Sequence, residues 1–393
     1  MSELSCPEAS VVSQVPSRSV ALSDLLGEII GIIGVVLCSL LLSVVILTLG
    51  RSIAAARRRK RRERVHDTLR AGLLDRLYSP GDSEWDAWVR RLSRVERSVL
   101  ESVLDSTLRE VEGSDAETLR ELSVALGIPA RARRNLSSGR ESVRLQALTW
   151  LTLLRDPTDE ILDRSYEPST TAERVAVARL VYAADQPDAE YGLSILLEDA
   201  NEPFSVFGVD TLYRLAERDV ETFLDRVAAS ASTWDSDLLA QVLLVVRSVG
   251  TPAEPDRLKW IVDQLDHPDG SVRAAAARTL GTVGWNARIR ANTPLKRIIH
   301  DGDPTVRSSV YQMLGEWRTE KARTTILSAL AEEADDRALV AAARALHTGN
   351  DTLAISALPP RARPAFEWVR EIHEYERRAR TGQNVAASTS TAR

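Results

Sequence analysis

Five histidines are the side chains of this protein best suited to bind a metal ion or to transfer a proton near neutral pH. They are His66, His267, His300, His347 and His373. None lies in an H-E-x-x-H motif, and none has a second histidine or a cysteine at metal-ligand spacing. The two cysteines, Cys6 and Cys38, are too few for a disulfide framework or a cysteine-rich metal centre. We therefore expect no metal site, and we interpret His267 and His300 as solvated turn residues.

Motifs for nucleophilic catalysis and for phosphate binding are also absent from the sequence. There is no G-x-S-x-G elbow, no P-loop and no G-x-G-x-x-G fingerprint. The adjacent carboxylates Glu332-Glu333 and Asp335-Asp336 lie between two helical patterns, where we interpret them as helix caps and solvated charge. The sequence predicts no catalytic residue, no cofactor and no small-molecule substrate.

An apolar segment near the N-terminus predicts a membrane anchor. Residues 29–49 contain no charge and no proline, and a helix of that length rises about 32 Å, enough to cross a hydrocarbon core of about 30 Å. An acidic leader precedes the segment, whereas a cleaved signal peptide has a basic leader and a shorter apolar run. We predict an extracytoplasmic tail over residues 1–25 and one transmembrane helix over residues 26–50.

The residues beside this segment predict its orientation. Residues 51–64 hold eight Lys or Arg against one Glu. The densest part of this basic collar is Arg57, Arg58, Arg59, Lys60, Arg61 and Arg62. Positive flanks stay in the cytoplasm and attract anionic lipid headgroups, so we expect a single-pass protein of the cell membrane with its N-terminus outside. Gly27, Gly31 and Gly34 form a small-residue stripe that would allow a homo-oligomer through helix association.

Helical periodicity continues after the basic collar. Val65, Leu69, Leu73 and Leu77 recur every four residues, which predicts an amphipathic neck helix within residues 51–80. Residues 83–112 carry a further apolar series at helical spacing, which is Trp85, Trp88, Leu92, Val95, Val99 and Leu104. No useful stretch alternates with the period of a β-strand. We expect an all-α protein in which residues 82–137 form a helical adaptor segment.

Internal repeats dominate the rest of the chain. Residues 266–281 read DHPDGSVRAAAARTLG and residues 301–315 read DGDPTVRSSVYQMLG, which places their Val-Arg pairs 34 residues apart. Further copies begin near Glu141, Ala172, Phe207, Leu238 and Arg337. One helical hairpin cannot bury its apolar face alone, so the roughly seven hairpins are expected to stack into one array over residues 138–360.

These repeats resemble the HEAT-repeat family, whose armadillo-like hairpins stack into an α-α superhelical solenoid. The resemblance rests on an Asp/Pro turn before a helix, a Val-Arg pair at its start, alanines within it and a Leu-Gly exit at Gly281 and Gly315. It implies that Arg144, Arg273 and Arg307 form a ladder with acidic residues of adjacent repeats.

Two segments follow the array. Residues 361–381 carry Ala365, Trp368, Ile372 and Tyr375 on one face, which predicts a helix that caps the solenoid. Residues 382–393 are small and polar, and we expect them to be a disordered tail.

The distribution of charge disfavours a nucleic-acid partner. Residues 65–393 hold 42 of the 51 basic and 51 of the 56 acidic residues, so the solenoid is net acidic and repels phosphate on average. One candidate basic patch lies at its start and consists of Arg131, Arg133, Arg134 and Arg140, continuing to Arg144. Three interpretations stay open for this patch: it contacts lipid headgroups, it contacts an acidic partner, or it is a solvated helix face.

The sequence favours a non-catalytic scaffold or adaptor. In this hypothesis a cytoplasmic solenoid binds a protein partner, which we expect to be membrane-associated, while the anchor confines it to the bilayer. The resemblance allows an accessory role beside a membrane enzyme. It also leaves two alternatives open, a repeat-based lyase of the bilin-attaching kind and a nucleic-acid-binding protein. The iron-binding His-Glu dipeptides of some related hydroxylases occur here only once, at His373-Glu374.

Overall fold

The computed structural model describes residues 39–49, 51, 64–78, 84–184, 189–198, 200–249, 255–284, 286–347 and 354–390. All regular structure in these ranges is α-helical or 3-10 helical, and they contain no β-strand. The prediction of an all-α protein is therefore confirmed. The chain divides into two compact units, Met1–Leu119 and Arg120–Arg393.

In the first unit, residues 39–49 lie in a helix. Its leucines Leu40, Leu41 and Leu42 are 61%, 60% and 61% exposed. Of the helices that the structure describes, none combines the length and the apolar character needed to cross a membrane. The remainder of the predicted span, with its glycine stripe, and the basic collar over residues 57–62 lie outside the described residues.

The neck and adaptor of the first unit are separate helices. Residues 64–77 form a helix that buries Leu69 and Leu73. α2 (Trp85–Arg91) and α3 (Arg94–Leu108) follow, and α4 (Ser114–Ala125) runs across the boundary at residue 119. The helical series over residues 83–112 is broken before α3, because Ser93 caps that helix: Ser93 Oγ accepts the Glu96 N–H, and the Glu96 carboxylate accepts the Ser93 N–H at 2.8 Å.

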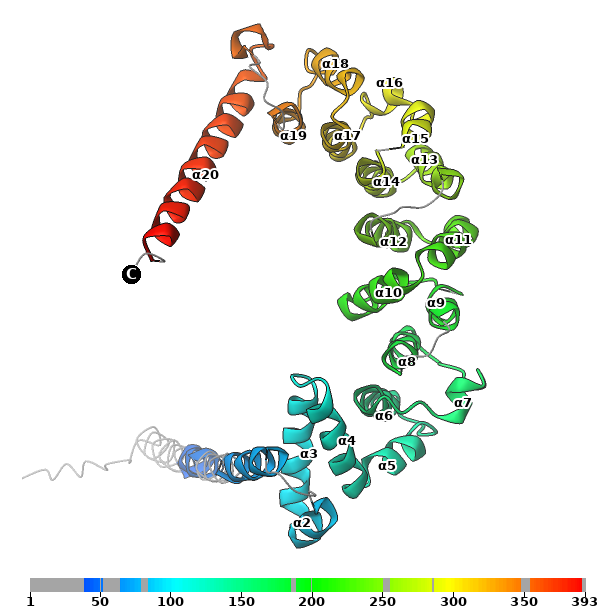
Figure 1. Ribbon diagram of the computed structural model, residues 1–393, viewed down its shortest axis with the longest axis vertical. Helices are drawn as coiled ribbons and strands as arrows, with labels where there is room; N and C mark the ends of the chain where they lie inside the picture. Colours follow the sequence, from blue (N-terminus) through cyan, green and yellow to red (C-terminus); the bar gives the residue numbers. More distant parts are fainter. Residues whose placement is uncertain are drawn as a thin grey trace, which may run out of the picture. The chain divides into compact units, whose positions relative to one another are not determined.

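The helices of the second unit lie in two layers, and Figure 1 shows the first layer on the concave side of the row. The first layer consists of α6 (Glu141–Leu154), α8 (Thr171–Ala183), α10 (Val206–Arg218), α12 (Ser236–Val249), α14 (Gly270–Thr282), α17 (Pro304–Trp317) and α19 (Asp336–His347). The second layer consists of α7 (Asp159–Leu162), α9 (Ala189–Leu197), α11 (Val220–Ser230), α13 (Lys259–Asp263), α15 (Ala287–Asn292), α16 (Leu295–Ile298) and α18 (Glu320–Ala329). α5 (Ile128–Asn135) precedes this array and α20 (Arg363–Ser390) follows it. Each sequence copy begins a first-layer helix.

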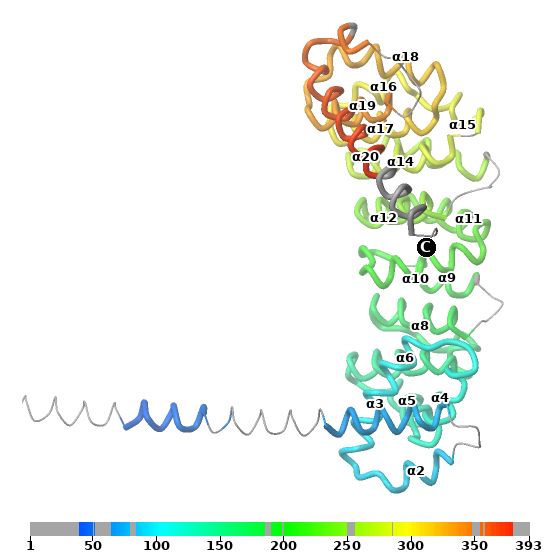
Figure 2. The backbone as a smooth tube through the Cα atoms, turned by 60° about the vertical axis from the view of Figure 1, so that its left-hand side comes forward, coloured from blue at the N-terminus to red at the C-terminus, as the bar shows by residue number. Residues whose placement is uncertain are grey.

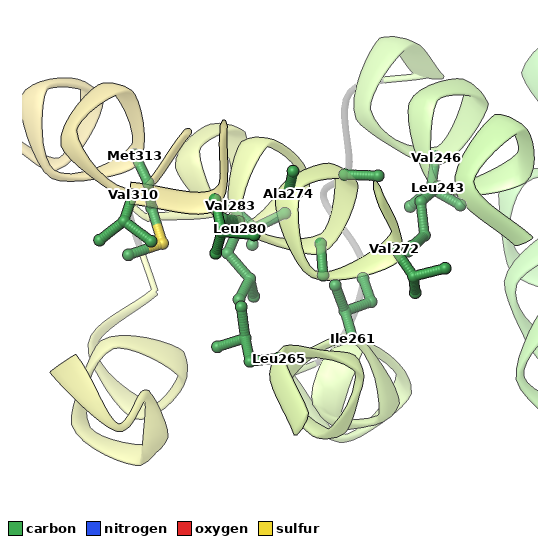
Figure 3. Packing of buried hydrophobic residues seen from close by; sticks show 14 of the residues in the cluster. Leu243, Val246, Ile261, Leu265, Val272, Ala274, Leu280, Val283, Val310 and Met313 are labelled. Atoms are coloured by element: carbon green, nitrogen blue, oxygen red, sulfur yellow. The ribbon is translucent and has the colours of Figure 1, made fainter. Parts of the chain in front are cut away.

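Consecutive first-layer helices pack against each other in chain order, as Figure 2 shows, and the contacts of α17 with α14 and α19 are the most extensive among them. Four consecutive alanines over residues 274–277 are buried in α14 and let its neighbours approach closely. Figure 3 shows the shared core, in which Leu243 of α12, Leu280 of α14 and Met313 of α17 lie over Ile261 and Leu265 of the second layer. This continuous core is the solenoid-like packing expected of stacked hairpins.

Helix caps explain where the best-matched repeats begin. Asp269 precedes α14 and its carboxylate accepts the Ser271 N–H at 2.7 Å. Asp303 does the same for α17 through Thr305 N–H at 2.7 Å, and Pro304 occupies the first helical position, where no backbone donor is needed.

The glycines interpreted as helix exits have a different role. Gly281 and Gly315 are buried inside α14 and α17, which continue to Thr282 and Trp317. A Cβ on Gly315 would lie 2.7 Å from the Cβ of Ala345, so the glycine allows α17 and α19 to cross closely. The Leu-Gly motif therefore marks a helix contact rather than a helix end.

A long helix closes the described chain. α20 runs from Arg363 to Ser390. No proline follows Pro364, so no residue removes a backbone donor that the helix needs, and the small residues after Gly382 continue it.

Candidate partner-binding face

Three arginines occupy the fourth position of first-layer helices. They are Arg144 of α6, Arg273 of α14 and Arg307 of α17. Each guanidinium binds a carboxylate at the beginning of the next first-layer helix: Arg144 Nε donates to Glu173 at 2.8 Å and Arg273 Nε donates to Asp301 at 2.8 Å. Arg307 binds Glu333 through Nε and Nη2, both at 2.8 Å.

The same arginines also bind the turn before their own helix. Nη1 of Arg144 donates to the carbonyl of Ser138 at 2.7 Å, and Nη1 of Arg307 donates to the carbonyl of Asp301 at 2.8 Å. Each side chain therefore joins two consecutive turns of the array. Because their donors and charges are already used inside the protein, these residues position the helices and are not free to bind a ligand.

Glu333 shows how strongly one of these pairs is held. Its side chain is 1% exposed, and its carboxylate accepts hydrogen bonds from Arg307, from the Tyr311 hydroxyl at 3.2 Å and from the Asp335 N–H at 2.9 Å. Burial alone would raise the pKa of this carboxyl, but these donors and the Arg307 charge outweigh burial and lower the pKa from 4.5 to about 2. The pKa of Tyr311 is raised by burial and by the Glu333 charge.

The candidate basic patch is divided among several partners. Arg133 of α5 binds Asp156 at 2.6 Å, and Arg134 donates to the carbonyl of Ala130 at 3.3 Å. Arg131 lies in the same helix, and Arg140 occupies the N-cap position of α6 without a capping hydrogen bond from its side chain. The charge of Arg144 is neutralised by Glu173. The structure thus leaves less free positive charge here than the sequence suggests.

The histidines separate into turn residues and one ring pair. His267 Nδ1 accepts a hydrogen bond from the Asp269 N–H at 3.1 Å, and His300 Nδ1 lies 3.6 Å from Glu332 Oε2. The rings of His347 in α19 and His373 in α20 meet edge to face with centroids 4.4 Å apart, a contact that their sequence spacing does not reveal. Burial lowers the pKa of His347, and His373 lowers it further.

No metal-binding constellation is present in the part of the chain that the structure describes. Those residues contain no group of three or more His, Cys, Asp or Glu side chains able to hold a metal ion. A groove of about 890 Å³ in the first unit lies between the neck helix and α3 and is lined by His66, Asp67, Arg94, Val95 and Ser98, among others. Among its polar groups, His66 Nδ1 lies 3.5 Å from the Asp67 carboxylate, and none of the described hydrogen bonds joins a serine of the groove to His66.

The exposed face of the first layer is the strongest candidate for a binding surface. Each first-layer helix packs between two neighbours and against the second layer, so only one narrow stripe of it reaches solvent. The ninth residue of every first-layer helix falls on or beside that stripe. In chain order these residues are Thr149, Arg179, Arg214, Leu244, Arg278, Gln312 and Arg344. We call this row the first-layer face.

Aromatic and arginine side chains gather on α8 and α10 of this face. Arg179 lies over the rings of Tyr182 and Phe207, with its guanidinium carbon 5.6 and 5.4 Å from their centroids. Arg179 and Arg214 share Asp210, at 2.8 and 3.0 Å. The Asp210 pKa is lowered because these two arginines outweigh the effect of burial. The cluster is a preformed polar and aromatic surface.

Apolar side chains on the same face are left in solvent. Val206 and Phe207 begin α10 and are 88% and 51% exposed, and Leu244 of α12 is 40% exposed. Exposed aromatic and aliphatic residues among arginines are typical of protein-binding surfaces. These residues were not predicted from the sequence. They are apolar residues at repeat positions where most copies carry a polar one. Recognising such a position requires knowing where each helix starts, and α10 and α12 lack the Val-Arg pair that marks the start in other copies.

The two-layered stack of helices defines this unit as an α-helical repeat array. Residues 258–347 match the family model for HEAT repeats, and they include α14, α17 and α19. This match supports the resemblance that the Val-Arg and alanine pattern indicated. HEAT repeats are generally non-catalytic and commonly mediate protein–protein interactions. No curated protein and no solved structure matches the chain.

Proposed function

We propose that this protein is a non-catalytic scaffold or adaptor that is held at the cell membrane by one helix and binds a protein partner through the first-layer face. The observation that carries the proposal is the exposure of Val206, Phe207 and Leu244 beside ordered arginines. Exposing such side chains to water is unfavourable, and a partner that covers them recovers the lost hydrophobic free energy.

The stacked architecture supports a binding role. A row of similar helices presents a long surface whose shape is fixed by its core and by the arginine ladder. A preformed surface loses little conformational entropy on binding, so shape and charge can be matched to one partner. The HEAT-repeat match over residues 258–347 agrees with this role.

The membrane anchor is part of the same proposal and is supported by two observations. Residues 29–49 carry no charge, and the three consecutive residues Leu40, Leu41 and Leu42 are all about 60% exposed, so the described part of this helix is apolar on every side. The basic collar over residues 57–62 supports a topology with the N-terminus outside and the repeats in the cytoplasm. The proposed partner is then a membrane protein or an enzyme complex at the inner membrane face.

Two experiments test the anchor. After alkaline extraction of native membranes the full-length protein should stay in the membrane pellet, and a variant that lacks residues 29–49 should be released. Protease added to sealed cells should remove only the first ~25 residues. Release of the wild-type protein by alkali, or digestion of the repeats in sealed cells, would refute the anchor or its orientation.

Partner binding is tested by chemical crosslinking in native membranes. Phe207→Asp places a charge on the first-layer face, whereas Leu162→Asp makes a similar change at a second-layer residue that is 42% exposed. We expect the wild type and Leu162→Asp to capture the same partner and Phe207→Asp to lose it. A partner captured equally by all three proteins would show that another surface binds.

A further inference from the structure

Arg278 differs from the other arginines on the first-layer face. Arg179 and Arg214 share Asp210, and Arg344 lies over the ring of Trp368 at 5.6 Å. Arg278 is partly buried in α14, yet it has no hydrogen-bond or ion-pair partner within the described ranges. A partly buried guanidinium normally binds a carboxylate or carbonyl groups, because burial without a partner is costly.

The surroundings of Arg278 make its charge more unfavourable. Arg247 of α12 reaches towards α17 and binds Glu316 at 3.2 Å. The Glu316 carboxylate lies over Gly281, one turn beyond Arg278, where an added Cβ would clash with it. Glu316 is therefore already engaged by Arg247, and burial together with the Arg247 charge lowers the pKa of Arg278. The free protein holds two cations and one anion at this point of the face.

We propose that Arg278 receives the carboxylate of an aspartate or glutamate of the partner, on a segment whose apolar side chain covers Leu244. The inference rests on the proposed function and specifies the chemistry of the partner. Leu244 and Arg278 occupy equivalent positions of adjacent helices, so they present an apolar contact and a cation side by side.

The spacing of the two residues limits the bound segment. Packed helices lie about 8–10 Å apart, and this is also the separation expected between equivalent residues of α12 and α14. A partner helix spans about 10 Å in seven residues, which is two turns, so residues seven apart lie on one face. Residues three apart on an extended strand also span about 10 Å but point to opposite faces. The segment is therefore a helix that carries its apolar and acidic residues seven apart.

The local charges favour a carboxylate over a phosphate. Glu316 and Asp210 lie on the same face, and the region over residues 65–393 is net acidic. A doubly charged phosphate would be repelled by these groups more strongly than a single carboxylate. One planar guanidinium matches one carboxylate through two parallel hydrogen bonds.

A peptide titration tests the carboxylate directly. The full-length protein, purified in detergent, is titrated with a short labelled helical peptide of leucine and glutamate and with the same peptide carrying glutamine for glutamate. We expect the glutamate peptide to bind at least about tenfold more tightly, a preference that added salt weakens. Arg278→Gln should remove the preference, and the matched variant Arg288→Gln, which changes an exposed arginine of the second layer, should keep it.

The unfolding temperature gives a second readout. Replacing a desolvated and unpaired cation removes an unfavourable charge, so Arg278→Leu should raise the unfolding temperature of the free protein by about 2–4 °C. Arg288→Leu should leave it unchanged. A lower unfolding temperature for Arg278→Leu would mean that the arginine stabilises the fold and would overturn the proposal.

The outcomes of these tests separate the inference from the proposed function. Equal affinity for the two peptides, no binding of either, or competition by inorganic phosphate as strong as by glutamate would refute the carboxylate site. None of these results depends on the natural partner. The crosslinking experiment with Phe207→Asp, by contrast, tests whether the first-layer face binds the partner and does not depend on Arg278.

Discussion

Removing Arg307 should open the C-terminal end of the array without unfolding the rest. In an Arg307→Met variant the Glu333 carboxylate stays in a site where it is 1% exposed but loses both hydrogen bonds from the guanidinium. The lowering of its pKa from 4.5 to about 2 corresponds to about 3 kcal/mol at 1.36 kcal/mol per pKa unit. Removing one partner of a buried ion pair generally costs about 3–5 kcal/mol, which agrees with this value.

The variant should therefore lose about 3 kcal/mol where α17 meets α19. Because stacked repeats contact only their neighbours, the effect should be local. Hydrogen exchange at neutral pH should show backbone amides of α19 exchanging roughly 100-fold faster, while those of α8 are unchanged. Arg288→Met is the matched control, since both members of the Arg288–Asp256 pair are exposed, and it should cost under about 0.5 kcal/mol.

The pH dependence provides a further check of the same reasoning. The folded-state pKa of Glu333 is lowered, so its contribution is present above pH 4.5 and is lost as the pH falls from about 4.5 towards 2. In the variant, Arg307 no longer offsets the effect of burial on the Glu333 pKa, so the stability of the variant should depend little on pH in this range. The stabilities of the two proteins should therefore converge in acid. The reasoning would be refuted if the α19 amides exchanged at the same rate in both proteins at neutral pH, or if the difference between their rates did not become smaller in acid.

Three further perturbations follow from individual contacts. Burial lowers the pKa of His347, so the stability of the protein should fall as the pH drops below 6.5, and an unfolding temperature that does not change between pH 7.5 and 5.5 would contradict this. Gly284→Ala places a Cβ in a clash with the Trp317 ring and should break the 2.8 Å hydrogen bond from that ring to the Leu280 carbonyl. We expect the free energy of unfolding, measured by denaturant titration, to fall by about 1–3 kcal/mol, and an unchanged midpoint would contradict this. Thr279→Val removes a buried 2.8 Å hydrogen bond to the Leu243 carbonyl, which should cost about 1 kcal/mol by the same measurement.

The first-layer helices could be predicted from the sequence because each must satisfy several demands at once. Asp269 and Asp303 cap helix starts, a Val-Arg pair follows, and alanines allow close packing. These requirements recur every 30 to 35 residues or so and are visible as a repeat. The second layer has no comparable pattern, because its helices are short and in places continue as 3-10 turns, as at α13 and its flanks.

The candidate face was much less accessible to sequence reasoning. Whether Arg278 pairs with a carboxylate depends on which residues the neighbouring helices bring to it, and in the structure Glu316 of α17 pairs with Arg247. The same limit applies to the candidate basic patch, where Asp156 neutralises Arg133 from 23 residues away. The arginine ladder, by contrast, was anticipated through a family resemblance, since Arg144 and its equivalents sit at a fixed repeat position.

The most direct test of the scaffold hypothesis compares two leucines of nearly equal exposure. Leu244 on the first-layer face is 40% exposed and Leu162 in the second layer is 42% exposed. A photo-crosslinking amino acid placed at each position in the full-length protein would be activated in native membranes, and the adducts quantified. We predict one reproducible protein adduct from position 244 and none above background from position 162. The same adduct yield from both positions, or a specific adduct from position 162 alone, would contradict the account.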